Sequence, residues 1–388
     1  MPHHPTWNIR WIKSIGEVDQ GQWDRLALPL DTPLLEWPWL HALEASGSIA
    51  PPNGWHPLHL TVWQGEDLIA AAPLYLKTHS AGEFVFDHLW VRLASDMDTP
   101  YYPKLVGMSP ATPVIGYRFL LADDVDREAV QKVMFTAIDA ICTRLGITAC
   151  QFNFVDPEWG AAALKSGYLA WRHQSYLWRN PGYSSFEDYL KPFRSTQRRN
   201  IRRERRRMAG EGIAIQTLTG DQIPVDLAGL MYRCYEITNA QFGPWAAKFL
   251  NRAFFERIFR AYRHRLLIVA AHNQHAEMPL ALSMLVHKGG QLMGRYWGST
   301  RQIKDLHFNL CFYSPIDWAI RNNIETFDPG AGSEHKLFRG FAAIPSLSLH
   351  RFYQPDLKAV FQRFIGSVNI VEQDNIDELN QHLPFARS

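Results

Sequence analysis

The sequence predicts a mixed α/β protein built from two similar halves. Stretches with the two-residue alternation of β-strands alternate along the chain with stretches whose apolar residues recur at spacings of three and four. The latter spacing is typical of amphipathic helices. A strand, a polar turn and a strand with Pro-Leu occur twice, as LTVWQGEDLIAAAPLYL at 60–76 and as LIVAAHNQHAEMPLALSML at 267–285. Duplication of one α/β unit explains this repeat, and a chance similarity between two hairpins is the alternative.

The composition is that of a globular protein. The 388 residues are 46% hydrophobic and 20% charged, which allows two or three domains or one large one. No apolar stretch reaches the roughly 18 residues of a transmembrane helix, and the start MPHHPTWNIR lacks the basic and apolar regions of a signal peptide. The four cysteines show no CxxC pair and fit reduced thiols. We therefore expect a cytoplasmic protein, and its net charge of +2 is too small to bind polyanions by bulk charge.

The first half contains a series of helices and strands with clear boundaries. The helix at 126–145 is the most regular, and Gly146 ends it. The other expected elements are a short helix at 35–46, a hairpin at 58–77, a strand at 147–155, a helix at 158–167 and a strand at 170–180.

A second half begins near residue 182. Pro181-Gly182 breaks the chain, and Ser184-x-x-Glu187 has the pattern of a capping box that opens a helix. We therefore predict two lobes, 1–181 and 182–388. The expected elements that follow are a strand at 212–220, helices at 223–239 and 248–263, three strands within 266–299, a helix at 306–323 bent at Pro315, and a strand at 324–330.

An arginine-rich run, FRSTQRRNIRRERRRMAGEG, opens the second half. It holds eight arginines between residues 194 and 207 and one acid, Glu204. On a helix, an apolar seam faces inward and the arginines cover the rest; the seam residues are Leu190, Phe193, Ile201 and Met208. The run is either a solvated face that neighbouring acids neutralise, or an anion-binding face for the phosphates of RNA, a nucleotide cofactor or a lipid. Arginine in place of lysine favours bidentate phosphate recognition, for which we select Arg198, Arg199 and Arg202.

The stretch FDPGAGSEHKLFRGF at 327–341 places ionisable side chains among glycines after a strand. Gly330 and Gly332 allow positive φ or a close approach of the backbone to a ligand. Either Glu334 or His335 is able to remove a proton. The carboxyl ends of strands are favoured ligand sites in open α/β sheets.

The same stretch carries two cations. Lys336 and Arg339 are suited to an anionic ligand, and internal salt bridges within a polar loop are the alternative use of both.

A strand end at 294–299, GRYWGS, carries Arg295, Tyr296 and Trp297. These side chains form either one wall of a substrate cleft, with Tyr296 as a hydrogen-bond or proton donor, or aromatic packing on both faces of a strand. His307 follows in the same neighbourhood.

The first half also has an irregular region, GEFVFDHLW at 82–90 and DTPYYPKLVGMSPATPVIGYR at 98–118. Asp87, His88 and Lys104 are its candidate functional residues, because long irregular loops are either functional or cover a sheet. The sequence has no Walker loop, HExxH, GxSxG or strand-linked GxGxxG motif, and its histidines show no metal-ligand spacing, so we predict no metal site.

Several of these motifs together resemble the FemAB-like acyltransferases of the GNAT superfamily, which are described as peptidoglycan biosynthesis or recognition proteins. The motifs are GEFVFDHLW, YYPKL, TPVIGYR, IRRERRR, GRYWG, LHFNLCFY and GSEHKLFRGF, and the resemblance covers residues 35–355. It implies two tandem GNAT-like lobes and direct attack of an amine on an activated acyl group. A carboxylate or histidine would take the amine proton, and backbone N–H groups would polarise the carbonyl.

Similarity to the Fem ligases implies an aminoacyl-tRNA donor and a peptidoglycan-precursor amine as acceptor. Carried over by position, the resemblance marks cleft-lining residues within 328–341, namely Gly330, Gly332, Lys336, Arg339 and Phe341.

The donor has two alternatives. The coenzyme A loop of the GNAT group, Gln/Arg-x-x-Gly-x-Gly/Ala, has its closest counterpart in RYWGST from Arg295, which ends in Thr300 on a predicted strand. The arginine run, by contrast, is compatible with tRNA. We therefore expect no tightly bound cofactor, an acyl-CoA or aminoacyl-tRNA co-substrate, and a working cleft in the second lobe alone. The rival hypothesis is a non-catalytic GNAT-fold protein that binds a peptidoglycan precursor or RNA.

Overall fold

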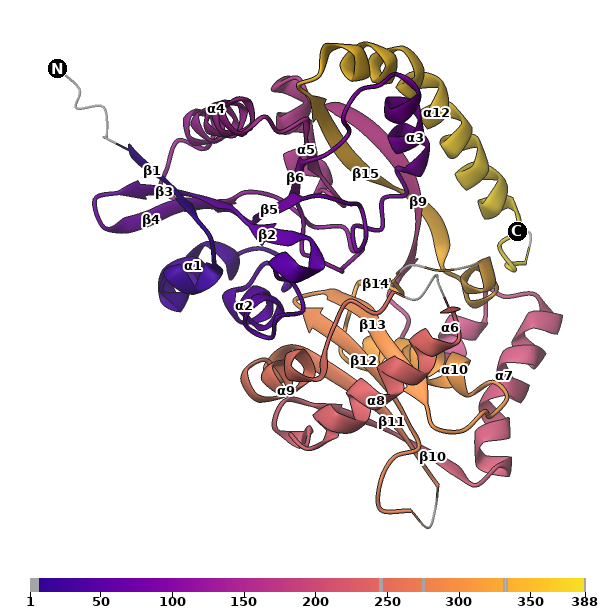
Figure 1. Cartoon of the computed structure of the whole chain (residues 1–388). Coiled ribbons are helices and arrows are strands. Elements are labelled where there is room, and N and C mark those ends of the chain that lie inside the picture. Colours follow the sequence, from indigo (N-terminus) through magenta and orange to yellow (C-terminus); the bar gives the residue numbers. More distant parts are fainter. Residues whose placement is uncertain (1–6, 244–246, 274–275, 331, 333, 387–388) are drawn as a thin grey trace. The chain divides into compact units, whose positions relative to one another are not determined.

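The computed structural model describes residues 7–243, 247–273, 276–330, 332 and 334–386, which form two compact units (Figure 1). Unit 1 contains Met1–His173 and Pro345–Gln373, and unit 2 contains Gln174–Ile344 and Asp374–Ser388. The predicted division at 181/182 placed the whole C-terminal segment in the second half. The structure instead assigns 345–373 to unit 1, because Leu349–Phe352 pair with Ala149–Phe152 of that unit.

Unit 1 has two sheets. The first is antiparallel, in the order β1 (Trp7–Ile12), β3 (His59–Gln64), β4 (Asp67–Ala72), β7 (Leu120–Leu121). The second contains β8 (Ala149–Phe152), β6 (Lys104–Gly107), β5 (Leu74–Lys77) and β2 (Trp55–Pro57), in that order, and β15 (Ala342–Phe352) pairs with β8. Strands β6 and β8 run parallel, while β5 pairs antiparallel with both β6 and β2.

The helices of unit 1 follow their local sequence signals. Helix α4 (Arg127–Leu145) begins where the Asp126 side chain accepts from the Ala129 N–H, and it ends at Gly146 in the left-handed region, φ +63°. The others are α1 (Gln20–Ala27), α2 (Trp37–Ala45), α3 (His88–Asp96), α5 (Pro157–Lys165), the 3₁₀ turns Ile15–Glu17 and Pro51–Asn53, and α12 (Pro355–Gln381), whose last residues belong to unit 2.

Unit 2 is built on one mixed sheet. Its order is β10 (Ile213–Thr219), β11 (Leu266–Asn273), β12 (Ala281–Lys288), β13 (Gln291–Ser299), β14 (Thr326–Asp328), and then the end of β9 (Leu169–Arg179). The first four strands are antiparallel, β13 and β14 are parallel, and β14 pairs antiparallel with β9. The three predicted strands within 266–299 are thus confirmed.

The helices of unit 2 are mostly those expected. They are α6 (Phe186–Leu190), α7 (Ser195–Gly210), α8 (Leu227–Ala240), α9 (Arg252–Ala261), α10 (Leu306–Phe308), the π-helical Asn309–Tyr313 and α11 (Ser314–Arg321), with 3₁₀ turns at Gly220–Gln222, Arg263–Arg265 and Glu334–Arg339. The N-cap of α6 is Ser185, which accepts from the Asp188 N–H, so Ser184 was the wrong cap.

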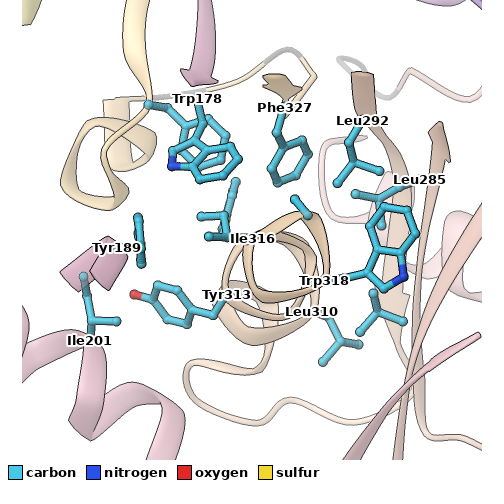
Figure 2. Close-up of a cluster of buried hydrophobic side chains, with 14 of the residues drawn as sticks. Trp178, Tyr189, Ile201, Leu285, Leu292, Leu310, Tyr313, Ile316, Trp318 and Phe327 are labelled. Atoms are coloured by element: carbon cyan, nitrogen blue, oxygen red, sulfur yellow. The ribbon is translucent and has the colours of Figure 1, made fainter. Parts of the chain in front are cut away.

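The core of unit 2 confirms the predicted apolar seam of the arginine run. Leu190, Phe193, Ile201 and Met208 are all buried in one cluster. Figure 2 shows the helical segment that carries Leu310, Tyr313 and Ile316 in the middle of this cluster. This packing holds α7 in a fixed rotation about its axis, which decides which arginines face solvent.

Two regions predicted as irregular contain regular structure. The region 82–118 includes α3 and β6, and the stretch after β14 includes the 3₁₀ helix Glu334–Arg339, here called η7. Over the described part of the chain, no helix combines the length and apolar character needed to span a bilayer.

Candidate active site

The two parallel strands of unit 2 end at different points. The pairing of β13 with β14 covers only Gln291–Met293 and Thr326–Asp328, whereas β13 continues to Ser299. The chain that follows β14 therefore lies at the carboxyl end of β14, beside the continuing β13. Carboxyl ends of strands favour ligand sites in open α/β sheets.

A β-bulge presents Arg295 at this edge. Met284 of β12 pairs with Tyr296 and the next residue, Leu285, pairs with Gly294, so Arg295 is the extra residue. Bulges redirect side chains and occur often beside active sites. The Nε and Nη1 atoms of Arg295 are buried and have no hydrogen-bond partner among the described residues. Because buried donors without acceptors are costly, the site is suited to an oxygen atom of a ligand.

Two glycines allow the segment after β14 to lie against β13. A Cβ atom at Gly330 would sit 2.9 Å from the Gly294 carbonyl oxygen, and one at Gly294 would sit 3.3 Å from the Pro329 oxygen. Gly330 also has φ +78°. Gly330 thus has the positive φ that the sequence suggested, and its close neighbour in the structure is β13 of the same chain.

Asp328 and Lys336 hold the Gly330 peptide from both sides. The Gly330 N–H donates to Asp328 Oδ1 at 2.7 Å, and the Lys336 Nζ donates to the Gly330 oxygen at 2.5 Å. Both side chains are buried. Burial raises the pKa of Asp328, although the Gly330 N–H and Arg295 oppose this. Burial lowers the pKa of Lys336 to about 8, with Asp328 opposing and Arg295 reinforcing the decrease.

Gly332 completes this arrangement, because its Cβ position would lie 3.3 Å from the Lys336 Nζ. Its φ of +137° also favours glycine.

The two candidate proton acceptors have different surroundings. Glu334, the first residue of η7, is exposed. The His335 ring is half-buried, and its centroid lies 5.6 Å from that of His307 and 5.4 Å from that of Phe312. Burial lowers the pKa of His335 to about 4, so its imidazole is neutral near pH 7.

Arg339 is placed in an internal ion pair. Its Nη2 lies 3.1 Å from Glu204 Oε2, its Nη1 donates to the His335 oxygen at 2.8 Å, and its guanidinium carbon lies 3.4 Å from the Phe308 ring centroid. Glu204 also accepts from the Tyr313 hydroxyl. Arg339 thus ties η7 to α7, which corresponds to the salt-bridge alternative.

Phe341 lies in the core. It is fully buried, with ring centroids 5.6 Å from Phe312 and 5.2 Å from Phe327. The sequence analysis expected Phe341 to line a cleft, whereas the structure places it in the core of unit 2.

The aromatic residues of β13 pack in two different environments. Tyr296 meets the rings of Tyr235 at 5.3 Å and Phe255 at 5.7 Å, on α8 and α9. Trp297 lies 4.4 Å from His307, which in turn meets His335. The structure therefore brings Trp297 and His335 together through His307, and places Tyr296 in an aromatic wall.

The arginine run divides into internal and exposed members. Arg198 donates to the carbonyl oxygens of Lys191 at 3.1 Å and Phe193 at 2.5 Å, and Arg202 pairs with Glu187 at 2.6 Å. Further pairs join Arg205 to Asp317 and Arg207 to Asp305. These contacts fit the neutralised-face alternative.

Three exposed arginines form what we call the arginine stripe: Arg199, Arg203 and Arg206. Their spacing of four and three places them on one face of α7. Within the described part of the chain, no carboxylate lies at ion-pair distance from any of them. The stripe is therefore suited to an external anion.

Sequence reasoning did not assign Asp328 to the site, although an Asp that ends a strand before Pro-Gly is a signal for it.

In unit 1, two of the three candidate residues, Asp87 and Lys104, are buried, while His88 is exposed. Sequence reasoning missed Lys77 and Glu83, which are buried in the same polar network. Among the described residues, no three His, Cys, Asp or Glu side chains gather in a way that would hold a metal ion.

Comparison with known proteins agrees with this fold. The model of the FemAB-like family, described as peptidoglycan biosynthesis/recognition, matches residues 14–387. FemX is 12% identical, with a TM-score of 0.53 over 90% of this chain and 98% of FemX. The C-terminal domain of an Agrobacterium fabrum protein named as a lysylphosphatidylglycerol synthetase is 10% identical, with a TM-score of 0.53 over 91% and 97%. None of the curated proteins compared matches. The mixed α/β, FemAB-like fold predicted from the sequence is confirmed.

Proposed function

The chain belongs to the FemAB-like family, and from that premise we propose that it is an N-acyltransferase that moves an activated acyl or aminoacyl group to an amine. The observation that carries the proposal is the Arg295 guanidinium, whose Nε and Nη1 atoms are buried and have no partner among the described residues, on the part of β13 that continues beyond β14. An acyl carbonyl or phosphate oxygen would satisfy those donors.

The cations of this edge would stabilise the charge that develops during acyl transfer. As the amine nitrogen attacks the acyl carbon, the C–N bond forms and negative charge collects on the carbonyl oxygen, which Arg295 and Lys336 would stabilise. The C–O bond of an aminoacyl ester or the C–S bond of a thioester then breaks, and the leaving group takes the bonding pair. Lys336 has three N–H donors, and the Gly330 oxygen occupies one of them.

Glu334 is our choice of proton acceptor. Its carboxylate is exposed and accessible to an incoming amine, whereas the His335 ring is packed and binds a proton only weakly, with a pKa of about 4. The amine proton would pass through Glu334 to the leaving group, and His335 would position η7. Tyr296 would orient the acyl group from its aromatic wall with Tyr235.

The arginine stripe favours an aminoacyl-tRNA donor. Its three exposed cations on one helix face match a phosphate backbone, whose binding depends on displaced counterions. An acyl-CoA donor is the alternative. The family description supports a peptidoglycan precursor as the acceptor.

The test is detection of the amide product by mass spectrometry, with aminoacyl-tRNA or acyl-CoA as donor and a lysine-containing peptidoglycan-type peptide as acceptor. We expect product with one donor, a loss of at least about tenfold in kcat for Glu334→Gln, and a similar loss for Arg295→Gln. Matched controls are Glu211→Gln and Arg301→Gln, which change exposed residues of the same unit.

The rival function predicts a different pattern. A non-catalytic binding protein would give no amide with either donor and would retain RNA or precursor in a manner that depends on the arginine stripe alone. Equal rates for the wild type and Glu334→Gln would remove Glu334 from the mechanism and return the role of proton acceptor to His335.

A further inference from the structure

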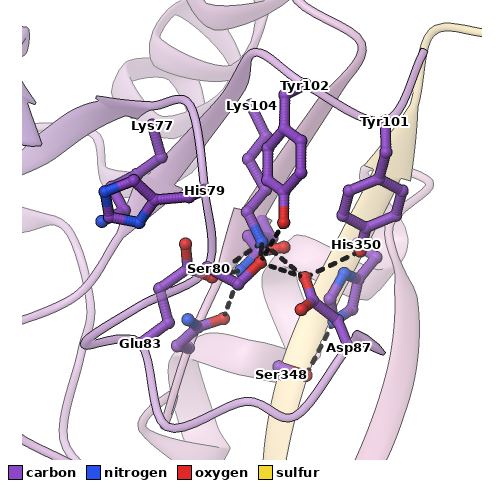
Figure 3. A network of polar contacts seen from close by, with 12 residues as sticks. Lys77, His79, Ser80, Glu83, Asp87, Tyr101, Tyr102, Lys104, Ser348 and His350 are labelled. Carbon is purple, nitrogen blue, oxygen red and sulfur yellow. Dashed lines mark hydrogen bonds and ion pairs between the residues drawn. The ribbon is translucent and has the colours of Figure 1, made fainter. Parts of the chain in front are cut away.

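A buried polar network occupies one end of the second sheet of unit 1 (Figure 3). Lys77, Glu83 and Lys104 are each 0% exposed and Asp87 is 2% exposed. Lys77 ends β5, Lys104 begins β6, and both carboxylates come from the segment that connects β5 to α3. Four ionisable side chains in the interior of one unit are unusual, because charged groups are seldom fully buried.

Lys104 is the centre of the network. Its Nζ lies 2.5 Å from Asp87 Oδ2, 2.8 Å from Glu83 Oε2 and 2.7 Å from the Ser80 hydroxyl. Burial lowers its pKa, but the two carboxylates outweigh burial and raise it overall, so Lys104 remains an ammonium. Burial raises the pKa of Glu83, although Lys104 opposes this increase.

The two oxygens of Glu83 differ in their contacts. Oε2 lies 2.8 Å from Lys104 and accepts from Gln151 Nε2 at 2.7 Å. Oε1 is also buried but has no hydrogen-bond partner among the described residues. Asp87 Oδ2 accepts from Tyr101, Ser80 and Lys104. Within the described part of the network, Glu83 Oε1 is therefore a buried carboxylate oxygen that lacks a donor.

Lys77 does not supply that donor. Its Nζ donates to the Ala81 oxygen at 3.0 Å and lies 3.5 Å from the Trp55 ring centroid. No carboxylate of the described residues lies within ion-pair distance of it. Burial lowers its pKa to about 7, with Glu83 opposing and Lys104 reinforcing the decrease.

The segment that connects β5 to α3 is irregular and contains a bulky residue with positive φ. Residues 78–87 form no helix or strand, and they carry both Glu83 and Asp87. Phe84, directly after Glu83, has φ +56°, a conformation that is rare for a bulky residue and is found where the surroundings impose it. Phe86 is 72% exposed on the outside of this segment.

We propose that the network is a binding site for a primary ammonium group, which donates an N–H to Glu83 Oε1. A guanidinium fits less well, because it favours both oxygens of a carboxylate and Oε2 is already occupied. A divalent metal ion would be repelled by Lys104, which already contacts one oxygen of each carboxylate. This site stands independently of the acyl-transfer proposal.

The test is thermal unfolding of the full chain in n-propylammonium chloride and, at equal concentration, in tetramethylammonium chloride, which has the same charge but no N–H donor. We expect n-propylammonium to raise the midpoint and tetramethylammonium to leave it unchanged. Guanidinium is unsuitable as a probe because it denatures. Equal shifts in both salts, or no shift in either, would overturn the proposal.

The variant Glu83→Gln removes the charge while keeping the shape, and it should abolish the n-propylammonium shift. Glu66→Gln, in the exposed β3–β4 turn of the same unit, is the control that should retain the shift in full. Retention of the shift in Glu83→Gln refutes the assignment. If Glu83→Gln does not fold, the comparison of the two salts on the wild type decides the question by itself.

Discussion

The buried ammonium of Lys77 predicts a stability that rises with pH. Its pKa falls from an ordinary 10.5 to about 7, because burial disfavours the charge and Glu83 only partly compensates. Between these two values the unfolded chain binds a proton that the folded chain does not. The free energy of unfolding therefore rises as pH increases, by at most about 1.4 kcal/mol per pH unit for this one group.

Lys77→Met isolates this contribution. Methionine keeps the length of the side chain and a favourable contact with the Trp55 ring, but it cannot titrate. Below pH 7 both states of Lys77 are protonated, so the difference between wild type and variant stays constant there. From pH 7 to 9.5 the wild type should gain up to about 3 kcal/mol relative to the variant.

Urea unfolding of both proteins at several pH values measures this difference through the transition midpoints. Titrating groups that do not interact with Lys77 act equally on both proteins and cancel. His79 and Glu83 titrate at lower pH, since Lys77 lowers the pKa of both, so the difference is read above pH 7. A difference that stays flat or falls between pH 7 and 9.5 would show that Lys77 keeps its ordinary pKa, and the account of the unit 1 network would then lose its neutral lysine.

Three further changes test the arrangement of unit 2. Gly298→Ala would place a Cβ 2.0 Å from the Cys234 oxygen of α8, and we expect a loss of about 3 kcal/mol, measured by urea unfolding. Glu204→Leu should lower the free energy of unfolding by about 3–5 kcal/mol, because Arg339 would remain as an unpaired buried charge. Adding Arg339→Met should recover most of this loss. No recovery in the double variant would contradict the ion-pair account. Replacing the three residues of the arginine stripe by glutamine should weaken RNA retention and reduce its salt dependence while stability changes by less than about 0.5 kcal/mol; an unchanged salt dependence would argue against the stripe.

The regular elements could be predicted because their signals are local. The apolar spacing, the Asp126 cap and the terminal Gly146 define α4 within its own residues. By contrast, α12 was not predicted, and η7 was hidden in a stretch whose glycines suggest a loop. A 3₁₀ helix of six residues has no period long enough to recognise.

The sequence could place the stretch 327–341 after a strand, but it could not predict the contacts of its residues. Its glycines and ionisable residues follow β14, as expected. That Arg339 turns inward depends on Glu204, far away in the sequence, and that Arg295 lacks acceptors depends on the register between β12 and β13. Both features depend on residues that are distant in the sequence, so a local sequence pattern does not predict them.

The sequence of the arginine run also could not show which arginines form ion pairs and which remain exposed. The neutralised-face alternative holds for Arg202, Arg205 and Arg207, which pair with carboxylates, whereas the anion-binding alternative stays a proposal for the arginine stripe. The rotation of α7, set by Ile201 and Met208 in the core, separates the two groups.

Hydrogen–deuterium exchange with and without donor tests the central claim most directly, namely that an activated acyl group binds where β13 continues beyond β14. On addition of aminoacyl-tRNA or acyl-CoA, we expect slower exchange in peptides that contain Arg295–Gly298 and η7, with Arg295→Gln losing most of this protection. Protection confined to other parts of the chain, or the same protection in Arg295→Gln, would contradict the account.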